Sequence, residues 1–347
     1  MKKWFKRIGL GLLLLLLIIY IWQFELANYG LMQLRGQLRV VNNAIPLEEF
    51  LQLPETTDDE RFKVQVIQEA RTFAFDSLGI NYSDNYTKIF DQEDKPSMYV
   101  VTACEPFEFK AKLWKFPVVG SVPYKGFFIR EKAMEEARSI RAADSIDVSV
   151  RTAGGWSTLG WFNDPVLSNM LKRSEGDLAS LIIHELTHGT LYIKDSVTFN
   201  ENLASFIGDK GAVLFLEAKY GKRAPEVKDF LARQADEELF KNYMLFASKK
   251  LDSTYVAMAS VEGMTRVEKQ EIKDQMIEGI RSGIDTVSFQ SDRYKAYFEK
   301  YKPDNTFFMS FLRYNSVLGL LEEELNDNFG GDLKRYLIYL KETYPSV

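Results

Sequence analysis

The sequence predicts an α+β fold in which a mixed lobe precedes a mostly helical one. Residues 81–165 are rich in aromatic residues, valine, glycine and proline, a composition typical of short strands and turns. From about residue 168 onward, apolar residues recur at helical spacing. No internal repeat, low-complexity tract or Pro/Ser-rich linker interrupts the chain after its N-terminal segment. We therefore expect one globular unit over residues 28–347, with a mixed α/β lobe at 28–167 and a helical lobe at 168–347.

Individual elements follow from the same local patterns. Strands are expected near residues 98–102, 116–122 and 124–129. Helices are expected over residues 60–78, 131–143, 225–250, 262–282, 306–325 and 331–342. Glycine and proline separate the last of these helices, at Pro303 and at Gly330–Gly331.

Composition excludes several classes of protein. Of the 347 residues, 46% are hydrophobic and 27% are charged, so the chain can bury a core and is not a disordered protein. The net charge is −5, and no basic stretch stands out beyond the first seven residues, which argues against nucleic acid as a partner. Cys104 is the only cysteine, so no intramolecular disulfide is possible, and we expect it to be a small buried apolar residue.

The N-terminus combines a positive cluster with a long apolar run. The cluster contains Lys2, Lys3, Lys6 and Arg7. The run Ile8–Trp22 is uncharged, and counting to Phe24 brings it close to the roughly 20 residues that span a bilayer core. It ends in bulky aromatic residues, without the small residues of a signal cleavage site. We therefore expect residues 1–27 to be a cytoplasmic basic tip and an uncleaved transmembrane signal anchor, with a cleaved signal peptide as the alternative.

The positive cluster also predicts the orientation of this anchor. Basic residues favour the cytoplasmic side of a membrane. Residues 1–7 are therefore expected in the cytoplasm, and everything after about residue 27 on the other side.

Both histidines of the chain lie in one short motif, His184-Glu185-Leu186-Thr187-His188. A spacing of four places the two imidazoles one turn apart on the same helix face, where both can bind one zinc ion. Glu185 can then reach a water at the metal rather than the metal itself. The surrounding run from Leu178 to Ile193 carries no other charged group, which indicates a mostly buried helix. A carboxylate on such a helix is costly unless a cation lies nearby.

A hydrolytic zinc site needs three protein ligands and one open position. The next helical pattern opens near Thr198, and Glu201 is the candidate third ligand. A loop at 193–198 would place it opposite the histidine pair, with one Zn²⁺ per chain. Ser205 is a candidate hydrogen-bond partner for a ligand histidine. The alternative for Glu201 is a carboxylate that only complements the positive end of its helix.

Hydrolysis assigns further roles. Glu185 would take the proton from the zinc-activated water and pass it to the leaving amine. A second donor to the oxyanion cannot be a third histidine. Tyr314 and Arg313 are the first candidates and Tyr255 a weaker one, with plain packing as the alternative for each. The aromatic segment 154–165 could hold a substrate backbone by strand addition or could equally be core.

These motifs resemble known zinc peptidases. The histidine motif, followed by Asn200-Glu201 and Ala204-Ser205, resembles the gluzincin HExxH metallopeptidases, although the separation is shorter than in thermolysin-like enzymes and the membrane alanyl aminopeptidases. The chain is more similar to a bacterial family of predicted zinc aminopeptidases. That resemblance rests on Arg35–Leu38, Trp114–Gly120, Tyr124–Phe128, Ser157–Pro165, His184–His188, Phe199–Ser205 and, more faintly, Asn305 with Tyr314.

The resemblance implies a zincin-like fold, a gluzincin-like zinc site and a membrane- or lipid-anchored enzyme. Two features depart from the family pattern. Trp156 stands where a tyrosine is expected, so a catalytic tyrosine is not available there. The lipid-attachment cysteine of some relatives is absent, which favours a protein anchor. The expected location is the bacterial cell membrane, with a single pass and the catalytic domain on the periplasmic side.

The favoured hypothesis is an aminopeptidase that acts on peptide substrates. Its substrate ammonium would need a carboxylate, for which Glu105, Asp164 and Glu201 are candidates. A zinc endopeptidase and another zinc amidohydrolase remain alternatives. A non-catalytic, membrane-tethered scaffold with structural zinc is disfavoured, because no further histidine or nearby cysteine closes the fourth position and a structural site has no use for Glu185.

Overall fold

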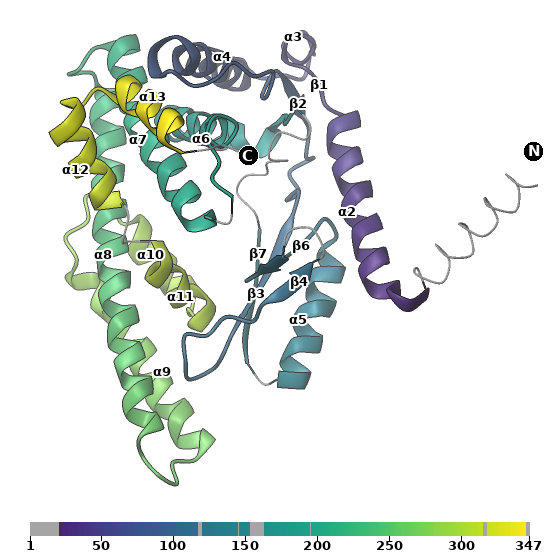
Figure 1. Ribbon diagram of the computed structural model, residues 1–347, viewed down its shortest axis with the longest axis vertical. Helices are drawn as coiled ribbons and strands as arrows, with labels where there is room; N and C mark the ends of the chain where they lie inside the picture. The colour runs from purple at the N-terminus through teal and green to yellow at the C-terminus, as the bar shows by residue number, and fades with distance from the viewer. Residues whose placement is uncertain are drawn as a thin grey trace, which may run out of the picture.

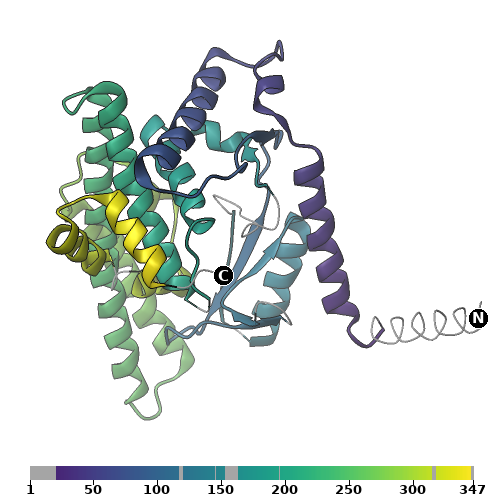
Figure 2. The same ribbon diagram turned by 45° about the horizontal axis from the view of Figure 1, so that its top comes forward.

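The computed structural model contains three small sheets flanked by helices (Figure 1). It describes residues 21–116, 120–144, 146–152, 163–194, 196–314 and 318–344. The predicted α+β class is confirmed, and the described chain is mostly helical. Figures 1 and 2 both show the sheets and helix α5 between helix α2 on one side and the group containing α7 and α8 on the other.

The elements of the first half alternate between helix and strand. They are α2 (Phe24–Asn42), β1 (Ile45–Pro46), α3 (Leu47–Phe50), α4 (Asp58–Leu78), β2 (Lys88–Phe90), β3 (Tyr99–Cys104), β4 (Trp114–Phe116), β5 (Gly120–Val122), β6 (Lys125–Phe127), α5 (Arg130–Asp144), β7 (Asp147–Thr152) and β8 (Val166–Leu167). The second half is helical. It contains the 3₁₀ helix η1 (Ser168–Lys172), α6 (Glu175–His188), α7 (Val197–Tyr220), α8 (Pro225–Ala259), α9 (Arg266–Gly283), η2 (Ile284–Thr286), α10 (Arg293–Lys300), α11 (Asn305–Tyr314), α12 (Leu318–Phe329) and α13 (Leu333–Thr343).

Each sheet is small. The sheet β6-β3-β7 is antiparallel throughout, with β3 in the centre. In the sheet β1-β2-β8, β2 pairs antiparallel with β1 and parallel with β8. Strands β4 and β5 form a separate antiparallel pair. Helix α5 covers β6-β3-β7, where Ala133, Ala137 and Ile140 pack in one cluster with Val101 and Val148.

The largest hydrophobic core draws on both predicted lobes. It includes Ile67 and Leu78 of α4 together with Ile183 of α6, Ile207 of α7 and Leu337 of α13. Helix α4 precedes residue 167 but packs among helices that follow it. The change from mixed to helical composition in the sequence therefore does not separate two independent cores.

A polar network attaches the C-terminal helices to the sheet. The buried Lys273 donates from Nζ to Asp147 Oδ2 (2.5 Å) and to the Pro106 carbonyl (2.9 Å). The Asn305 side chain donates to the Glu105 and Pro106 carbonyls. Because these groups are buried, removing one would leave its partners unpaired.

Most predicted helices and strands are present, with several differences. The predicted strand at 116–122 was wrong, because β4 ends at Phe116 and its antiparallel partner β5 begins at Gly120, with residues 117–119 outside the described residues. The stretch 306–325 contains two helices, α11 and α12, and residues 315–317 between them lie outside the described residues. Helices α2 and α10 were not predicted. Most of the predicted membrane anchor, up to residue 20, also lies outside the described residues. Among the helices that the structure does describe, none combines the length and apolarity needed to cross a bilayer.

Two glycines allow α6 and α7 to approach closely. A Cβ atom on Gly208 would lie 2.7 Å from the Ser180 carbonyl oxygen and 3.1 Å from His184 Cβ. A Cβ on Gly211 would lie 3.1 Å from two side-chain carbons of Ile183. Real Cβ atoms do not approach a backbone oxygen within 3.0 Å, so Gly208 fixes the distance between the two helices.

We expect Gly208→Ala to destabilise the protein by about 1–3 kcal/mol, because the added methyl group forces α7 away from α6. It should also weaken zinc binding, since His184 and Glu201 lie on opposite sides of this contact. The matched control is Gly279→Ala in α9, which has open space around its Cβ position and should stabilise the helix by up to about 1 kcal/mol. Denaturant unfolding and zinc titration measure both effects. Equal stability and zinc affinity in Gly208→Ala and wild type would contradict this interpretation.

Candidate metal centre

Helix α6 presents one turn of polar side chains from a mostly buried helix. Its first turn is capped by Ser174, whose Oγ accepts a hydrogen bond from the Asp177 amide at 3.3 Å. The apolar residues of α6 that precede the histidine motif, and Leu186 within it, are buried. The side chains of His184 and His188 are only 19% and 6% exposed.

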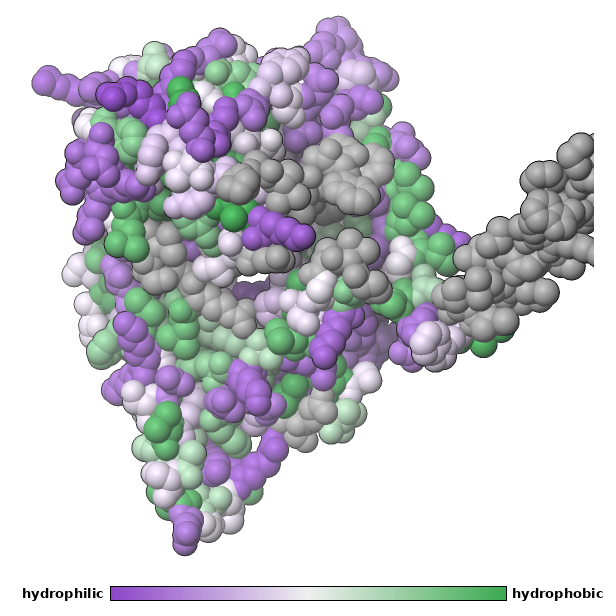
Figure 3. Space-filling model, viewed as in Figure 1, coloured by the Kyte–Doolittle hydropathy of each residue, from purple (hydrophilic) through white to green (hydrophobic). Residues whose placement is uncertain are grey.

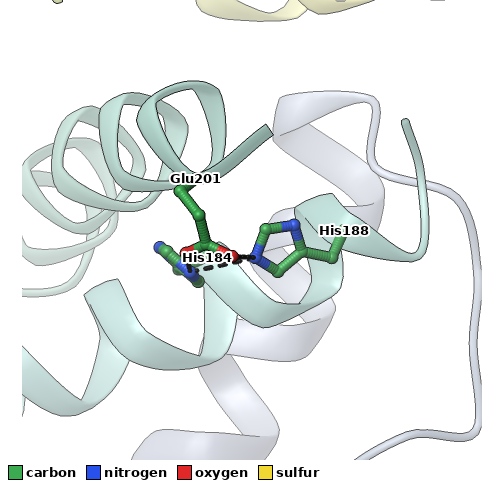
Figure 4. Close-up of side chains that lie close together, drawn as sticks. All are labelled: His184, His188 and Glu201. Carbon is green, nitrogen blue, oxygen red and sulfur yellow. Dashed lines mark hydrogen bonds and ion pairs between the residues drawn. The ribbon is translucent and has the colours of Figure 1, made fainter. Parts of the chain in front are cut away.

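Three side chains converge at the end of this helix, as Figure 4 shows. The Nε2 atoms of His184 and His188 lie 3.1 Å apart. Glu201, from the neighbouring helix α7, points its carboxylate at both rings, with Oε2 3.7 Å from His184 Nε2 and Oε1 3.6 Å from His188 Nε2. The structure therefore brings together all three predicted metal ligands.

The donor set and its spacing fit a zinc ion. Two ligand atoms at 2.0–2.1 Å from a tetrahedral zinc ion are about 3.3 Å apart. The observed separations of 3.1, 3.6 and 3.7 Å between ligand atoms lie close to that value. Two imidazoles and one carboxylate could hold the ion, and among these three residues no fourth donor closes the site.

Asn200 fixes the start of α7 and so the position of Glu201. The buried Asn200 side chain accepts a hydrogen bond from the Ile193 amide (2.9 Å) and donates to the Ile193 carbonyl (2.7 Å). This pair of bonds closes the loop between α6 and α7. The predicted loop at 193–198 differs from the observed connection at both ends, because α6 already ends at His188 and α7 begins at Val197.

The two imidazoles have different surroundings. Nδ1 of His184 lies 3.4 Å from Ser205 Oγ, the partner predicted from the sequence. Nδ1 of His188 is buried and has no hydrogen-bond partner within the part of the chain that the structure describes. Its ring packs edge-on against Tyr192, with centroids 6.0 Å apart.

The charges in the site act differently on the protonation of the three converging side chains. Burial and the neighbouring His184 lower the pKa of His188, which favours a neutral imidazole. Burial tends to raise the pKa of Glu201, but the two histidines outweigh it and lower that pKa overall. Burial also tends to lower the pKa of His184, but its hydrogen bond with Glu201 and the charge of Glu185 raise it overall.

Glu185 has the pKa of a general base poised near neutrality. Burial raises the pKa of its carboxyl to about 7 in the metal-free protein. The charge of His184 opposes this shift, and the charges of Glu201 and Asp164 add to it. A base with a pKa near the working pH is effective in proton transfer.

Tyr86 is a neighbour of Glu185 that sequence reasoning missed. It is fully buried, and burial together with the charges of Glu185 and Asp164 raises the pKa of its phenol well above the usual value. Its backbone has a positive φ of 61°, uncommon for a residue other than glycine, and its amide donates to the Asp164 carbonyl at 2.7 Å. No motif surrounds Tyr86, so only the fold could place it beside the site.

The described side chains do not include a predicted oxyanion donor beside the three converging residues. Tyr314 and Arg313 belong to the last turn of α11, but their side chains lie outside the described residues. Tyr255 is buried in a second core cluster, formed by residues of α8 to α11, where its hydroxyl donates to Asn305 Oδ1 at 2.6 Å. Packing is therefore the observed role of Tyr255.

The carboxylates considered for the substrate ammonium differ in their surroundings. Glu105 is exposed, and Glu201 faces the histidines. Asp164 is buried, and its charge acts on Glu185. Of the aromatic segment 154–165, residues up to 162 lie outside the described residues. Asp164, near its end, donates its backbone amide to Asn85 Oδ1 at 3.0 Å.

A family model described as "Putative aminopeptidase" matches residues 28–343. This match covers most of the chain, including α6, α7 and all three converging side chains. The chain therefore belongs to this aminopeptidase family. Comparisons with curated proteins and with solved structures each found no match.

The raised pKa of Glu185 predicts how the metal-free protein responds to pH. A carboxyl with a pKa of about 7 when folded and about 4.3 when unfolded binds more protons in the folded state between these values. Its contribution therefore lowers the unfolding free energy as pH rises through that window, by about 4 kcal/mol at most. Glu185→Gln removes this effect. The stability advantage of the variant over wild type should grow from pH 4.5 to pH 8 in chelator-treated protein.

Denaturant unfolding across this pH range measures the difference. Glu262→Gln, at an exposed position, serves as the control and should show no such trend. A difference between Glu185→Gln and wild type that does not vary with pH would contradict the assignment.

Proposed function

We propose that the protein is a membrane-anchored, zinc-dependent aminopeptidase with a gluzincin-like site. The observation that carries the proposal is the convergence of His184, His188 and Glu201, with Glu185 between the two histidines in the sequence. Membership of the aminopeptidase family supports peptide-bond hydrolysis. A zincin-like fold is part of the same proposal.

The proposed metal ligands and Glu185 have different roles in hydrolysis. Zinc, when bound, supplies Lewis-acid activation of water and polarisation of the scissile carbonyl. His184, His188 and Glu201 hold the ion from two helices. Glu185 removes the proton of the attacking water and passes it to the leaving amine. Burial raises the pKa of this carboxyl in the metal-free protein and so favours its acceptance of the water proton.

Exopeptidase action needs an anchor for the substrate's free ammonium group. Glu201 is occupied with the histidines and Glu105 is exposed. Of the three predicted carboxylates, Asp164 is the one that we test as this anchor, because its charge acts on Glu185. An endopeptidase needs no such group and remains the second candidate.

Membrane attachment completes the proposal. The basic cluster and apolar run of residues 2–24 support a single-pass anchor in a bacterial cell membrane. The cytoplasmic tip precedes it, and the catalytic domain lies on the extracytoplasmic side.

A non-catalytic zinc scaffold is the competing function from another class. A structural site is closed by a fourth cysteine or histidine. No other histidine exists, and the only cysteine, Cys104, is buried in β3 with a pKa raised by burial to about 12. Cys104 is not among the residues that converge on the candidate site, so its thiol does not close the fourth position.

Glu185→Gln should keep one zinc per chain and lose roughly 10²–10⁴-fold in kcat/KM, because it removes the general base but no metal ligand. Glu201→Gln should instead lose zinc affinity. The assay uses full-length protein, metal analysis, and matched peptides with free and acetylated N-termini. Glu262→Gln is the exposed control.

A preference for free N-termini that Asp164→Asn reduces would support the aminopeptidase. Equal turnover of acetylated peptides would favour the endopeptidase. Stoichiometric zinc without turnover of any peptide would contradict the enzyme and favour the scaffold.

A further inference from the structure

Helix α2 has apolar residues on two opposite faces. Its inner face packs on the sheet region, where Tyr29 stacks on Phe116 with ring centroids 5.4 Å apart and its hydroxyl donates to the Gly126 carbonyl at 2.9 Å. Val40 on the same side is buried. The inner face alone explains why the helix is attached to the domain.

The outer face carries an exposed apolar stripe. It consists of Phe24, Leu31, Leu34 and Leu38, whose exposed fractions are 55%, 43%, 50% and 38%. Their separations of seven, three and four residues place them on one side of the helix. Figure 3 shows hydrophobic residues along the margin of the molecule where α2 lies. A continuous exposed stripe of this kind marks an interaction surface.

Charges beside the stripe favour an anionic partner. Arg35 and Arg39, both exposed, lie one turn apart and adjacent to Leu31 and Leu38. Glu25 is the only acidic residue of α2. An apolar stripe flanked by arginines is typical of helices that lie at the surface of an anionic membrane.

The order of the chain places α2 next to the predicted anchor. Only Gln23 separates the apolar run Ile8–Trp22 from the start of α2. The last two residues of the run, Ile21 and Trp22, are 66% and 80% exposed. Gln23 lies between Trp22 and α2, and its backbone angles, φ −110° and ψ 34°, are not helical. This break allows the chain to change direction between a spanning segment and α2. Tryptophan at such a position is typical of the membrane–water boundary.

We propose that α2 lies flat on the membrane surface, with its leucine stripe in the boundary between headgroups and acyl chains and its arginines at anionic headgroups. The inference rests on the proposed insertion of the N-terminal segment. Because the inner face of α2 is bonded to the sheet region, such a contact would hold the catalytic domain in one orientation against the bilayer. The helix has 19 residues, so it would contact the surface over about 28 Å.

Site-directed fluorescence tests this contact in the full-length protein. Leu31→Cys, Leu34→Cys and Leu38→Cys are made singly in a Cys104→Ala background and labelled with an environment-sensitive dye. Each protein is reconstituted into phosphatidylcholine–phosphatidylglycerol vesicles. The control is Val256→Cys on α8, a site that is 67% exposed. We expect a nitroxide-labelled lipid to quench the α2 labels several-fold more strongly than the control, and aqueous iodide to do the reverse.

A double variant and an oxidation experiment separate a membrane contact from a contact between two copies of the chain. Arg35→Glu with Arg39→Glu should weaken lipid quenching at Leu34→Cys, most clearly in vesicles rich in phosphatidylglycerol. A dimer that forms through unlabelled Leu34→Cys under mild oxidation, with no lipid quenching, would identify a second copy of the chain as the occupant and overturn the proposal.

Vesicle flotation separates the two levels of failure. A protein that does not float with vesicles would overturn both the anchor and the α2 contact. A protein that floats, but whose α2 labels respond to iodide as the Val256→Cys label does, would overturn the α2 contact alone.

Discussion

The three proposed metal ligands come from two helices, so their geometry depends on how closely α6 and α7 approach each other. Gly208 sets that distance by leaving no side chain between α7 and the backbone of Ser180 and His184. Asn200 constrains the position of Glu201 along the chain, because its two hydrogen bonds with Ile193 close the connecting loop and fix where α7 begins. With these two constraints in place, the carboxylate of Glu201 reaches both imidazoles. Neither residue is itself a ligand, yet the site cannot form without the packing that they allow.

The same packing concentrates ionisable groups in a place where charge is costly. His184, His188, Glu185 and Asp164 lie together and are largely buried, and the Glu201 side chain beside them is 38% exposed. Burial alone would neutralise such groups, and Glu185 shows this effect in its raised pKa. A divalent cation would offset the cost by pairing with the carboxylate and the imidazoles. The features that destabilise the metal-free site are therefore those that suit it to proton transfer.

Local spacing explains what could be predicted from the sequence. The helical period places His184 and His188 on one face, and Glu201 follows in the next helix, so these three residues could be found without the fold. The α+β class and most helices followed from composition and periodicity. Tyr86 could not be found, because it joins the site through a loop distant in sequence and no pattern surrounds it. Helix α2 was not predicted, because it directly follows the apolar run Ile8–Trp22, which has the stronger hydrophobic pattern. Helix α4 shows that a change in composition need not divide a core, since tertiary packing decides which helices share one.

X-ray absorption at the zinc edge tests the central claim most directly. Purified full-length protein is loaded with one equivalent of zinc, and the fine structure reports the type and distance of the ligand atoms. Coordination by His184, His188 and Glu201 predicts two imidazole nitrogens and at least one carboxylate oxygen at about 2.0–2.2 Å, with no sulfur shell. Loss of one imidazole contribution in His188→Ala would assign it to this site. A sulfur scatterer at about 2.3 Å, or a shell without imidazole, would contradict the claim.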